Sequence, residues 1–182
     1  MGTDRIIAPM LDKSIVQQVF FGYYFRPDSP IQQLIHAMKY QGFPTLGVRL
    51  GERIGERLMQ SPLIRQIDWL IPMPIHGSRF RERRYNQSER IAKGIASRTG
   101  IAIVHNAVKR EIRTVPQAGL NAQQRTDNIK DAFIAGKKYI PDGICVGLVD
   151  DVITTGATIN ECARTLYNTG VKNIVAISIA AA

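Results

Sequence analysis

The sequence predicts an α/β fold with a mostly parallel central sheet flanked by helices. Short apolar runs alternate with amphipathic segments along much of the 182-residue chain, and this alternation is typical of β-α-β units. The runs at 69–71 and 144–149 carry no charged residue, as expected of strands that are covered on both faces. The composition is that of a globular domain, with 45% hydrophobic and 21% charged residues.

Each expected element has a local reason. Apolar residues at helical spacing predict helices at 30–40, 46–58, 88–98 and 159–168. The apolar or alternating runs predict strands at 69–71, 101–108, 144–149 and 174–179. Residues 111–128 are rich in Arg, Gln, Asn and Thr and predict a long loop. We divide the chain into an N-terminal arm with a helical hood at 1–65 and a core at 66–182.

Several classes of protein do not fit this sequence. No run approaches the ~18 consecutive apolar residues of a membrane span, so membrane insertion is not expected. The start, residues 1–5, lacks the layout of a signal peptide. Cys145 and Cys162 form no CxxC motif and no disulfide framework. The expected location is therefore the reducing cytoplasm.

The chain is basic, with a net charge of +9. The excess lies in the middle of the sequence, whereas residues 139–182 carry two basic groups against four acidic ones. A positive field favours nucleic acid, anionic lipid or phosphorylated small molecules as partners, and net charge alone does not choose among them.

Ligands of parallel sheets bind at the carboxyl ends of strands, here the positions after Ile71, Val108 and Val149. The strongest chemical signal is the segment 148–158, in which an apolar strand runs into Asp150 and Asp151 and a short loop leads to a helix. Small residues let backbone N–H groups approach an anion, and a helix N-terminus favours negative charge. The loop residues expected to hold a phosphate are Thr154, Thr155, Gly156, Ala157 and Thr158. The two carboxylates repel phosphate and suit sugar hydroxyls, or Mg²⁺ held through water.

A phosphate site beside a site for hydroxyls and a metal describes a ribose 5-phosphate. At this point the segment resembles the binding motif of type I phosphoribosyltransferases, which use phosphoribosyl pyrophosphate (PRPP). The resemblance implies their fold with a small hood, Mg²⁺ as cofactor, and catalytic roles for Asp150 and Asp151. Neither a Walker A loop nor a GxGxxG fingerprint is present.

The segment 71–76 follows another predicted strand and resembles the pyrophosphate-binding loop of these enzymes. The resemblance places Pro74, Ile75, His76 and Arg79 at the pyrophosphate. A single histidine in a loop also commonly has a structural role.

The basic segment 79–87 resembles the RxRxRGxNQ signature of the ComF/GntX family, which is linked to bacterial competence for DNA uptake. Arg84 stands where Gly is usual, which matters if that position needs a positive φ. A charge run of this kind is otherwise typical of a solvated face. The expected contacts to a mobile loop or to DNA are Arg81, Arg83, Arg84, Arg110 and Arg125.

Two further segments resemble this family: 35–42 resembles its KYxG segment, and the spacing across 110–133 resembles its RxxRTxxQxxLxxxxRxxNxxxAF pattern. In related transferases the latter region closes over the substrate, so Arg113 or Lys39 would stabilise the departing pyrophosphate. Many members carry an N-terminal cysteine-rich zinc module. This chain has no Cys before Cys145, so no zinc site of that type is expected.

Three hypotheses follow. The first is a Mg²⁺-dependent phosphoribosyltransferase that transfers phosphoribose from PRPP to an unknown small acceptor and releases pyrophosphate. The second is a non-catalytic module that binds PRPP or another phosphoribosyl ligand and serves DNA uptake through contacts with competence proteins or nucleic acid. The third is a single-stranded DNA-binding competence protein, against which stands the small number of aromatic residues among the arginines. A homodimer is compatible with each.

Overall fold

The computed structural model describes residues 14–111 and 131–182. Five strands form a parallel sheet in the order β1-β7-β6-β2-β3. They are β1 (Gln18–Tyr24), β2 (Trp69–Pro72), β3 (Ala102–Ile103), β6 (Cys145–Ile153) and β7 (Asn173–Ala181). The helices are α2 (Pro30–Tyr40), α3 (Pro44–Leu58), α4 (Gly77–Arg83), α5 (Gln87–Thr99) and α7 (Ala157–Asn168), with a short 3₁₀ helix at Pro62–Arg65. The strands β4 (Val108–Arg110) and β5 (Phe133–Ala135) form a separate antiparallel pair.

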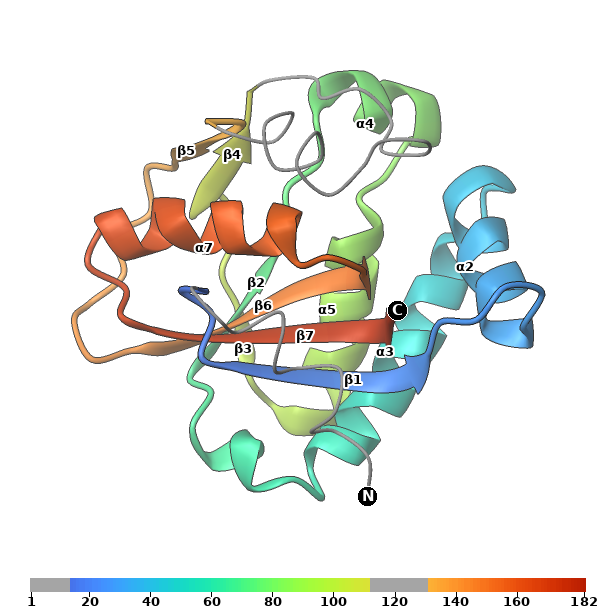
Figure 1. Cartoon of the computed structure of the whole chain (residues 1–182), viewed down its shortest axis with the longest axis horizontal. Coiled ribbons are helices and arrows are strands. Elements are labelled where there is room, and N and C mark those ends of the chain that lie inside the picture. The colour runs from blue at the N-terminus through green and yellow to red at the C-terminus, as the bar shows by residue number, and fades with distance from the viewer. Residues whose placement is uncertain (1–13, 112–130) are drawn as a thin grey trace.

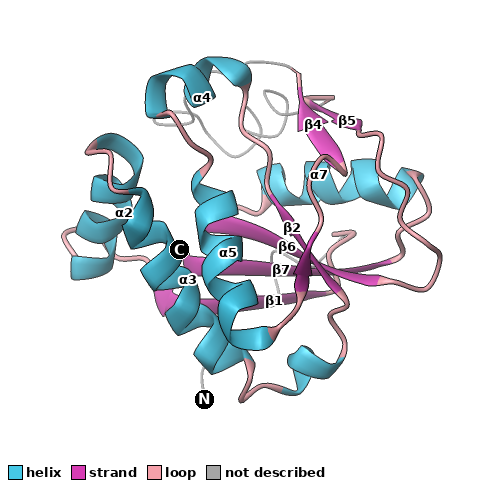
Figure 2. Cartoon of the chain, turned by 180° about the vertical axis from the view of Figure 1, so that it is seen from behind, coloured by secondary structure: helices cyan, strands magenta, loops and turns pink. Residues whose placement is uncertain are grey.

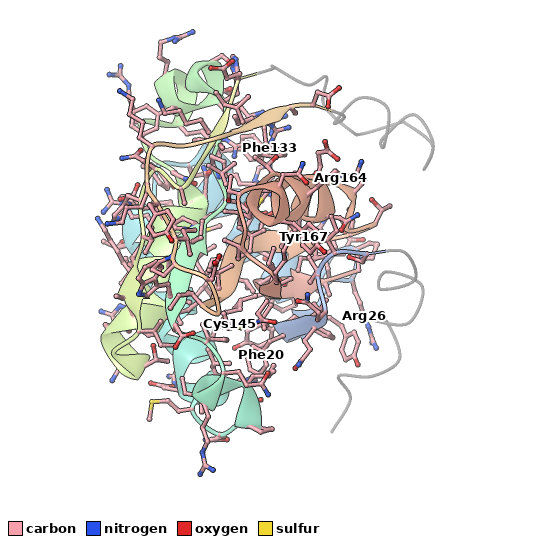
Figure 3. All side chains as sticks on the ribbon, turned by 90° about the vertical axis from the view of Figure 1, so that its left-hand side faces the viewer. Phe20, Arg26, Phe133, Cys145, Arg164 and Tyr167 are labelled. Carbon is pink, nitrogen blue, oxygen red and sulfur yellow. The ribbon has the colours of Figure 1, made fainter. Side chains whose placement is uncertain are left out.

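The sheet lies between two layers of helices (Figures 1 and 2). Viewed from the side, α7 lies against one face of the sheet and α5 with α3 against the other (Figure 3). Side chains alternate along a strand, so β6 sends Leu148 into the core under α7 and Val149 into the core under α3 and α5. Both residues are fully buried. The prediction of an α/β fold with a mostly parallel sheet is confirmed.

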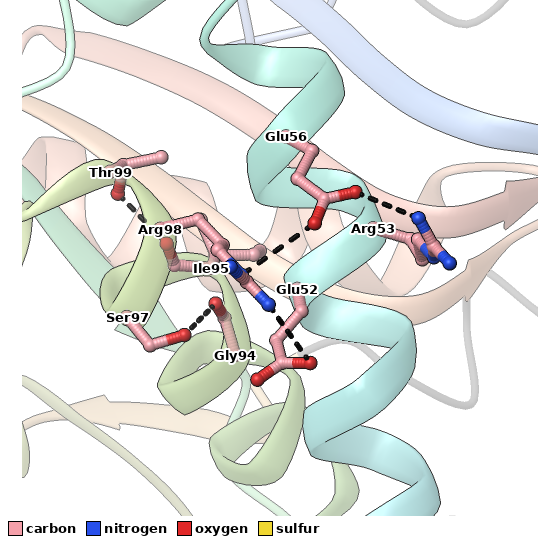
Figure 4. A network of polar contacts seen from close by, with 8 residues as sticks. All are labelled: Glu52, Arg53, Glu56, Gly94, Ile95, Ser97, Arg98 and Thr99. Carbon is pink, nitrogen blue, oxygen red and sulfur yellow. Dashed lines mark hydrogen bonds and ion pairs between the residues drawn. The ribbon is translucent and has the colours of Figure 1, made fainter.

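The helices α3 and α5 approach each other through glycines. A Cβ atom added at Gly51 would lie 2.1 Å from the carbonyl oxygen of Ile91, and one added at Gly94 would lie 2.1 Å from that of Val48. At the rim of this contact Arg98 lies 3.6 Å from a carboxylate oxygen of Glu52 and of Glu56 (Figure 4). Such half-exposed ion pairs contribute little to stability, so α5 is positioned by the close backbone contact and by its buried residues Ile91, Ala92 and Ile95.

Most elements lie where the sequence predicts them. The helix predicted at 30–40 is α2, and the other three predicted helices are α3, α5 and α7, each of which begins one or two residues earlier than expected. The sequence reading missed β1, β5 and α4. The first two are short or partly exposed strands, and α4 lies inside the segment that we interpreted only by its charge.

Two strand predictions need correction. The single strand predicted at 101–108 is wrong, because Asn106 has a φ of 62° and breaks the extended backbone between β3 and β4. Val108 therefore pairs with Ala135 outside the central sheet and marks no ligand position at its edge. The strand predicted at 144–149 continues to Ile153, because β7 pairs with it as far as Ala181. Asp150 and Asp151 consequently belong to the strand and not to the following loop.

The segment before residue 65 contributes β1 to the sheet and α3 to a helix layer, besides α2. The division of the chain at residue 65 stays a prediction. Among the helices of the described ranges, none has the length and apolar character needed to cross a bilayer.

The topology singles out the junction of β2 and β6. These strands pair in parallel, with Pro72 opposite Val149. From β2 the chain continues through α5 to β3, and from β6 it continues through α7 to β7. Strands β3 and β7 lie on opposite sides of the β2–β6 pair, and helices α5 and α7 cover opposite faces of the sheet. In open parallel sheets, ligands bind beyond the carboxyl ends of the strands where the connections diverge in this way.

Helix α4 ends in an unusual conformation at Arg84. This residue has a φ of 66°, in the left-handed region, and its N–H donates to the carbonyl of Phe80 at 2.8 Å. A glycine adopts this conformation without the steric cost that a side chain incurs. The position at which the ComF/GntX signature usually has Gly therefore has a positive φ in this protein, although Arg84 occupies it.

Arg84→Gly is therefore expected to stabilise the fold, by about 0.5–1 kcal/mol, because the relieved strain exceeds the added entropy of the unfolded chain. Chemical denaturation measures this. Arg81→Gly, inside the same helix, is the matched control and is expected to destabilise the fold by about 1 kcal/mol. Loss of stability in Arg84→Gly would contradict the prediction.

Candidate functional site

A pocket of about 200 Å³ opens at the carboxyl ends of β2 and β6. Its walls come from α2, the loop after β2, α4, the start of α5, β4, β6 and the start of α7. The charged side chains that line it are Lys39, Arg79, Arg83, Arg110, Asp150 and Asp151. The pocket is thus a basic cavity with an acidic floor, at the position that the sheet topology favours.

The two carboxylates of the floor have different surroundings, because neighbouring residues of a strand point to opposite faces. Asp150 accepts a hydrogen bond from the Ser88 hydroxyl at 3.1 Å and one from the N–H of Asp151 at 2.9 Å. Burial, and then the negative charge of Asp151, raise the pKa of Asp150 from 3.8 to about 7. Asp151 is 8% exposed and forms an ion pair with Lys39 at 2.9 Å.

Lys39 is held at the pocket by the last turn of α2. The hydroxyl of the buried Tyr85 donates to the carbonyl oxygen of Met38, and the guanidinium of Arg83 lies 5.2 Å from the ring centre of Tyr40. The predicted hood helix is therefore attached to the segment between α4 and α5. The sequence predicted a role for Lys39 at the site, and the structure brings it to the acidic pair.

The turn from β6 to α7 contains the residues predicted to bind a phosphate. Gly156 caps α7 with a φ of 73°, and Thr154 and Thr155 are exposed. A small hollow of about 70 Å³ is lined by residues 152–159 together with Asp150. Thr158 borders both this hollow and the larger pocket. The turn thus presents backbone N–H groups and hydroxyls beside the acidic pair, an arrangement that suits an anion.

The loop after β2 contributes Pro74 and Ile75 to the pocket, and α4 contributes Arg79. His76 has another position. Its Nδ1 accepts a hydrogen bond from the N–H of Ser78 at 3.1 Å and lies 2.8 Å from the Ser78 hydroxyl. The ring thus caps the N-terminus of α4, and no pocket described above includes it.

The arginines predicted to make contacts divide into two groups. Arg83 and Arg110 line the pocket, whereas Arg81 and Arg84 are exposed on α4 outside it. Burial and the positive charge of Arg79 lower the pKa of Arg110. The negative charge of Asp150 partly offsets this lowering. Cationic side chains therefore already crowd this side of the cavity.

The predicted roles of Arg113 and Arg125 concern residues outside the described ranges. The long loop predicted at 111–128 also lies almost wholly in that part of the chain.

Sequence reasoning assigned no role to two residues at the start of α5. Gln87 and Ser88 are 1% and 2% exposed, and both line the pocket. Asn86 precedes them and links the two walls, because its side-chain amide donates to the carbonyl of Met73 at 2.9 Å and its Oδ1 accepts from the N–H of Ser88 at 3.0 Å. The N-cap residue Asn86 predicts that a helix begins here, and Gln87 is the last residue of the segment 79–87 that resembles the ComF/GntX signature, which could have drawn attention to it.

The donor set of the floor fits Mg²⁺ in one respect. Mg²⁺ prefers oxygen ligands and is commonly held by one or two carboxylates together with substrate phosphates and waters, and Asp150 and Asp151 supply such carboxylates. Within residues 14–111 and 131–182, no group of three or more His, Cys, Asp or Glu side chains is arranged to hold a metal. A magnesium ion here would need oxygens from a ligand and from water.

Comparison with known proteins identifies the family. No protein family profile matches the chain. Competence protein F of Haemophilus influenzae is 32% identical over 170 residues, which span 91% of this chain and 71% of that protein. The chain belongs to the ComF family.

Other relatives agree with membership of the ComF family. The DNA utilization protein YhgH of Salmonella typhimurium is 27% identical over 149 residues, or 80% of this chain and 64% of that protein. Competence protein ComFC of Streptococcus pneumoniae is 30% identical over 109 residues, which span 60% of this chain and 46% of that protein. The chain thus matches a part of each relative.

The raised pKa of Asp150 predicts a pH-dependent stability. Between pH 4 and 7 the folded protein binds more protons than the unfolded chain, so stability falls as the pH rises through this range. Asp150→Asn keeps the shape of the protonated acid and removes this effect. We expect it to be more stable than the parent by about 2–4 kcal/mol at pH 8 and nearly equal to it at pH 4.

Thermal unfolding of both proteins between pH 4 and 8 measures this difference. Asp142→Asn, at an exposed position, is the control and is expected to show no such trend. A constant difference between Asp150→Asn and the parent at all pH values would contradict the prediction.

Proposed function

We propose that this protein binds PRPP with Mg²⁺ and transfers its phosphoribosyl group to a small acceptor, in the service of competence or DNA utilization. One observation carries the proposal: the acidic pair near the end of β6 lines a pocket with several arginines, and the turn that follows β6 lines a small hollow beside it. PRPP has the matching order of groups, with a 5-phosphate, a ribose with two free hydroxyls, and a diphosphate.

Each part of the ligand has a complementary part of the site. The turn at 154–158 takes the 5-phosphate at the start of α7. Asp150 and Asp151 accept hydrogen bonds from the ribose hydroxyls. The diphosphate lies towards Arg79, Arg83 and Arg110, where its negative charge offsets the crowding of cations. Such a ligand would account for both features, because its hydroxyls match the acidic floor and its phosphate groups match the basic walls.

The transfer breaks the bond between the anomeric carbon and the diphosphate oxygen, whose electron pair leaves with pyrophosphate. The acceptor forms the new bond to that carbon and loses a proton. Positive charge develops on the ribose and negative charge on the leaving group, so the carboxylates and the arginines lie where each charge appears. Mg²⁺, held by these carboxylates through water and by diphosphate oxygens, would supply further neutralisation of the leaving group.

The chemistry needs no covalent nucleophile from the chain, and its cysteines do not offer one. Cys162 is fully buried, and burial together with the charge of Asp150 raises its pKa. Burial also raises the pKa of Cys145, which lies at the opposite end of β6 from the acidic pair. Thiolate formation is therefore disfavoured at both positions.

Binding of single-stranded DNA is the second candidate function. The relatives named for competence and DNA utilization support it. So does one surface feature: Arg81 and Arg84 are exposed on α4 together with Phe80, whose side chain is 50% exposed. Cations that track phosphates and an aromatic ring on which a base stacks are the elements of such a surface.

The PRPP proposal predicts a ligand-dependent gain in thermal stability. At PRPP concentrations of about 100 times the Kd, in the presence of Mg²⁺, the fold is expected to gain about 2.7 kcal/mol. The double variant Asp150→Ala, Asp151→Ala should lose this gain, and Asp142→Ala should keep it. Absence of any shift in the parent at millimolar PRPP would refute the proposal. Pyrophosphate release with a panel of bases and amines then tests turnover.

The DNA proposal predicts an electrostatic affinity located on α4. Replacing Arg81 and Arg84 by Gln should lower the affinity for single-stranded DNA and reduce the slope of log K against log salt by about one unit or more. Fluorescence anisotropy over a salt series measures both. The same variant should keep the thermal shift with PRPP. A salt slope equal to that of the parent would contradict a DNA surface on α4.

A further inference from the structure

Gln87 is a buried polar residue whose side chain the fold leaves unused. It is the first residue of α5, it is 1% exposed, and it lines the pocket. Its Nε2 has no hydrogen-bond partner in the part of the chain that the structure describes. Buried donors without partners are rare in native proteins because they lose their hydrogen bonds to water without replacement.

The neighbours of Gln87 differ from it in this respect. Asn86 uses its side chain to connect Met73 with Ser88, and Ser88 donates to Asp150. The hydrogen bonds of Asn86 and Ser88 therefore connect the walls of the site to one another. Gln87 makes no such contact, and an apolar side chain of similar size would fill its place without an unpaired donor. Its Nε2 donor is thus available to a ligand that enters the pocket.

A second unused donor in the same pocket indicates the chemistry of the partner. The Nε of Arg83 is buried and has no hydrogen-bond partner among the described residues, although its guanidinium lies over the ring of Tyr40. Both groups are donors, and both line the pocket that Arg79 and Arg110 also border. A ligand group with several acceptor oxygens and negative charge satisfies them, and a phosphate or diphosphate has this character.

The anionic group that would meet Gln87 and Arg83 differs in position from the proposed 5-phosphate. The turn at 154–158 lines its own hollow, which neither Gln87 nor Arg83 borders. The acceptor oxygens that meet Gln87 therefore belong to the other end of the ligand. For the PRPP of the proposed function, on which this inference rests, that end is the diphosphate.

We propose that Gln87 and Arg83 hydrogen-bond the diphosphate of the ligand and thereby make the site specific for PRPP over ribose 5-phosphate. Gln87 adds a directional donor without adding charge. A fifth basic side chain would repel the four that already line the cavity, Lys39, Arg79, Arg83 and Arg110. A neutral amide is thus well suited to complete the binding of an oxyanion here.

Calorimetric titration with PRPP and with ribose 5-phosphate, both in the presence of Mg²⁺, tests this specificity. Gln87→Met removes the amide and keeps the volume. It is expected to weaken PRPP binding by about tenfold to a hundredfold and to leave ribose 5-phosphate binding within about twofold. Gln87→Glu should weaken PRPP binding further, because its carboxylate repels the diphosphate. Gln60→Met, at an exposed position, is the control and should bind both ligands as the parent does.

Arg83→Gln gives an independent measurement on α4, with Arg81→Gln as its matched control. The first should lose affinity for PRPP selectively, and the second should not. The inference is overturned if the parent binds PRPP and Gln87→Met binds it equally well. It is also overturned if Gln87→Met loses both ligands to the same degree, which would assign Gln87 to the structure of the site. If the parent protein does not bind PRPP, the proposed function itself is refuted, whether or not ribose 5-phosphate binds.

Discussion

The parallel pairing of β2 with β6 determines the arrangement of the whole site. Both strands end at the same edge of the sheet, and the chain leaves them towards opposite sides and opposite faces. The loop after β2 and the turn after β6 are therefore brought together although the two strands are far apart in the sequence. The other walls of the pocket are added to this pair: α4 and the start of α5 follow β2, α7 follows β6, α2 follows β1, and β4 comes from outside the central sheet.

Charge is distributed across this edge in a way that the fold alone does not require. Asp150 and Asp151 lie side by side in sequence, and their mutual repulsion is offset by Lys39 on one side and by a hydroxyl and an N–H group on the other. Arginines from α4 and β4 then face the pair across the cavity. Such a balance holds opposite charges close together without complete neutralisation, and a carboxyl group of raised pKa in a cleft of this kind indicates a candidate functional site.

Local signals in the sequence were sufficient for the fold class, four helices and the segment from Leu148 to Thr158. They were insufficient where the structure depends on partners distant in sequence. The extension of β6 to Ile153 depends on pairing with β7, and the pocket that Gln87 lines receives further walls from α2, β4 and β6. The contact of Lys39 with Asp151 spans 112 positions in the chain, and no periodicity or motif reports such a distance. The sequence shows that Arg84 replaces the Gly of the ComF signature. It does not show that Arg84 has a positive φ.

The glycine contact between α3 and α5 connects the helix layer to the pocket, because the first turn of α5 lines that pocket. Because the two backbones touch at Gly51 and Gly94, α5 cannot slide or tilt without a clash, and its first turn with Gln87 and Ser88 keeps its place relative to β6. Helix α2 packs Ile31, Ile35 and Met38 into the same core as α5, and Tyr85 joins its last turn to the segment after α4. A side chain at Gly51 or Gly94 would therefore displace the wall of the pocket as well as the helix layer, although neither glycine lines the pocket.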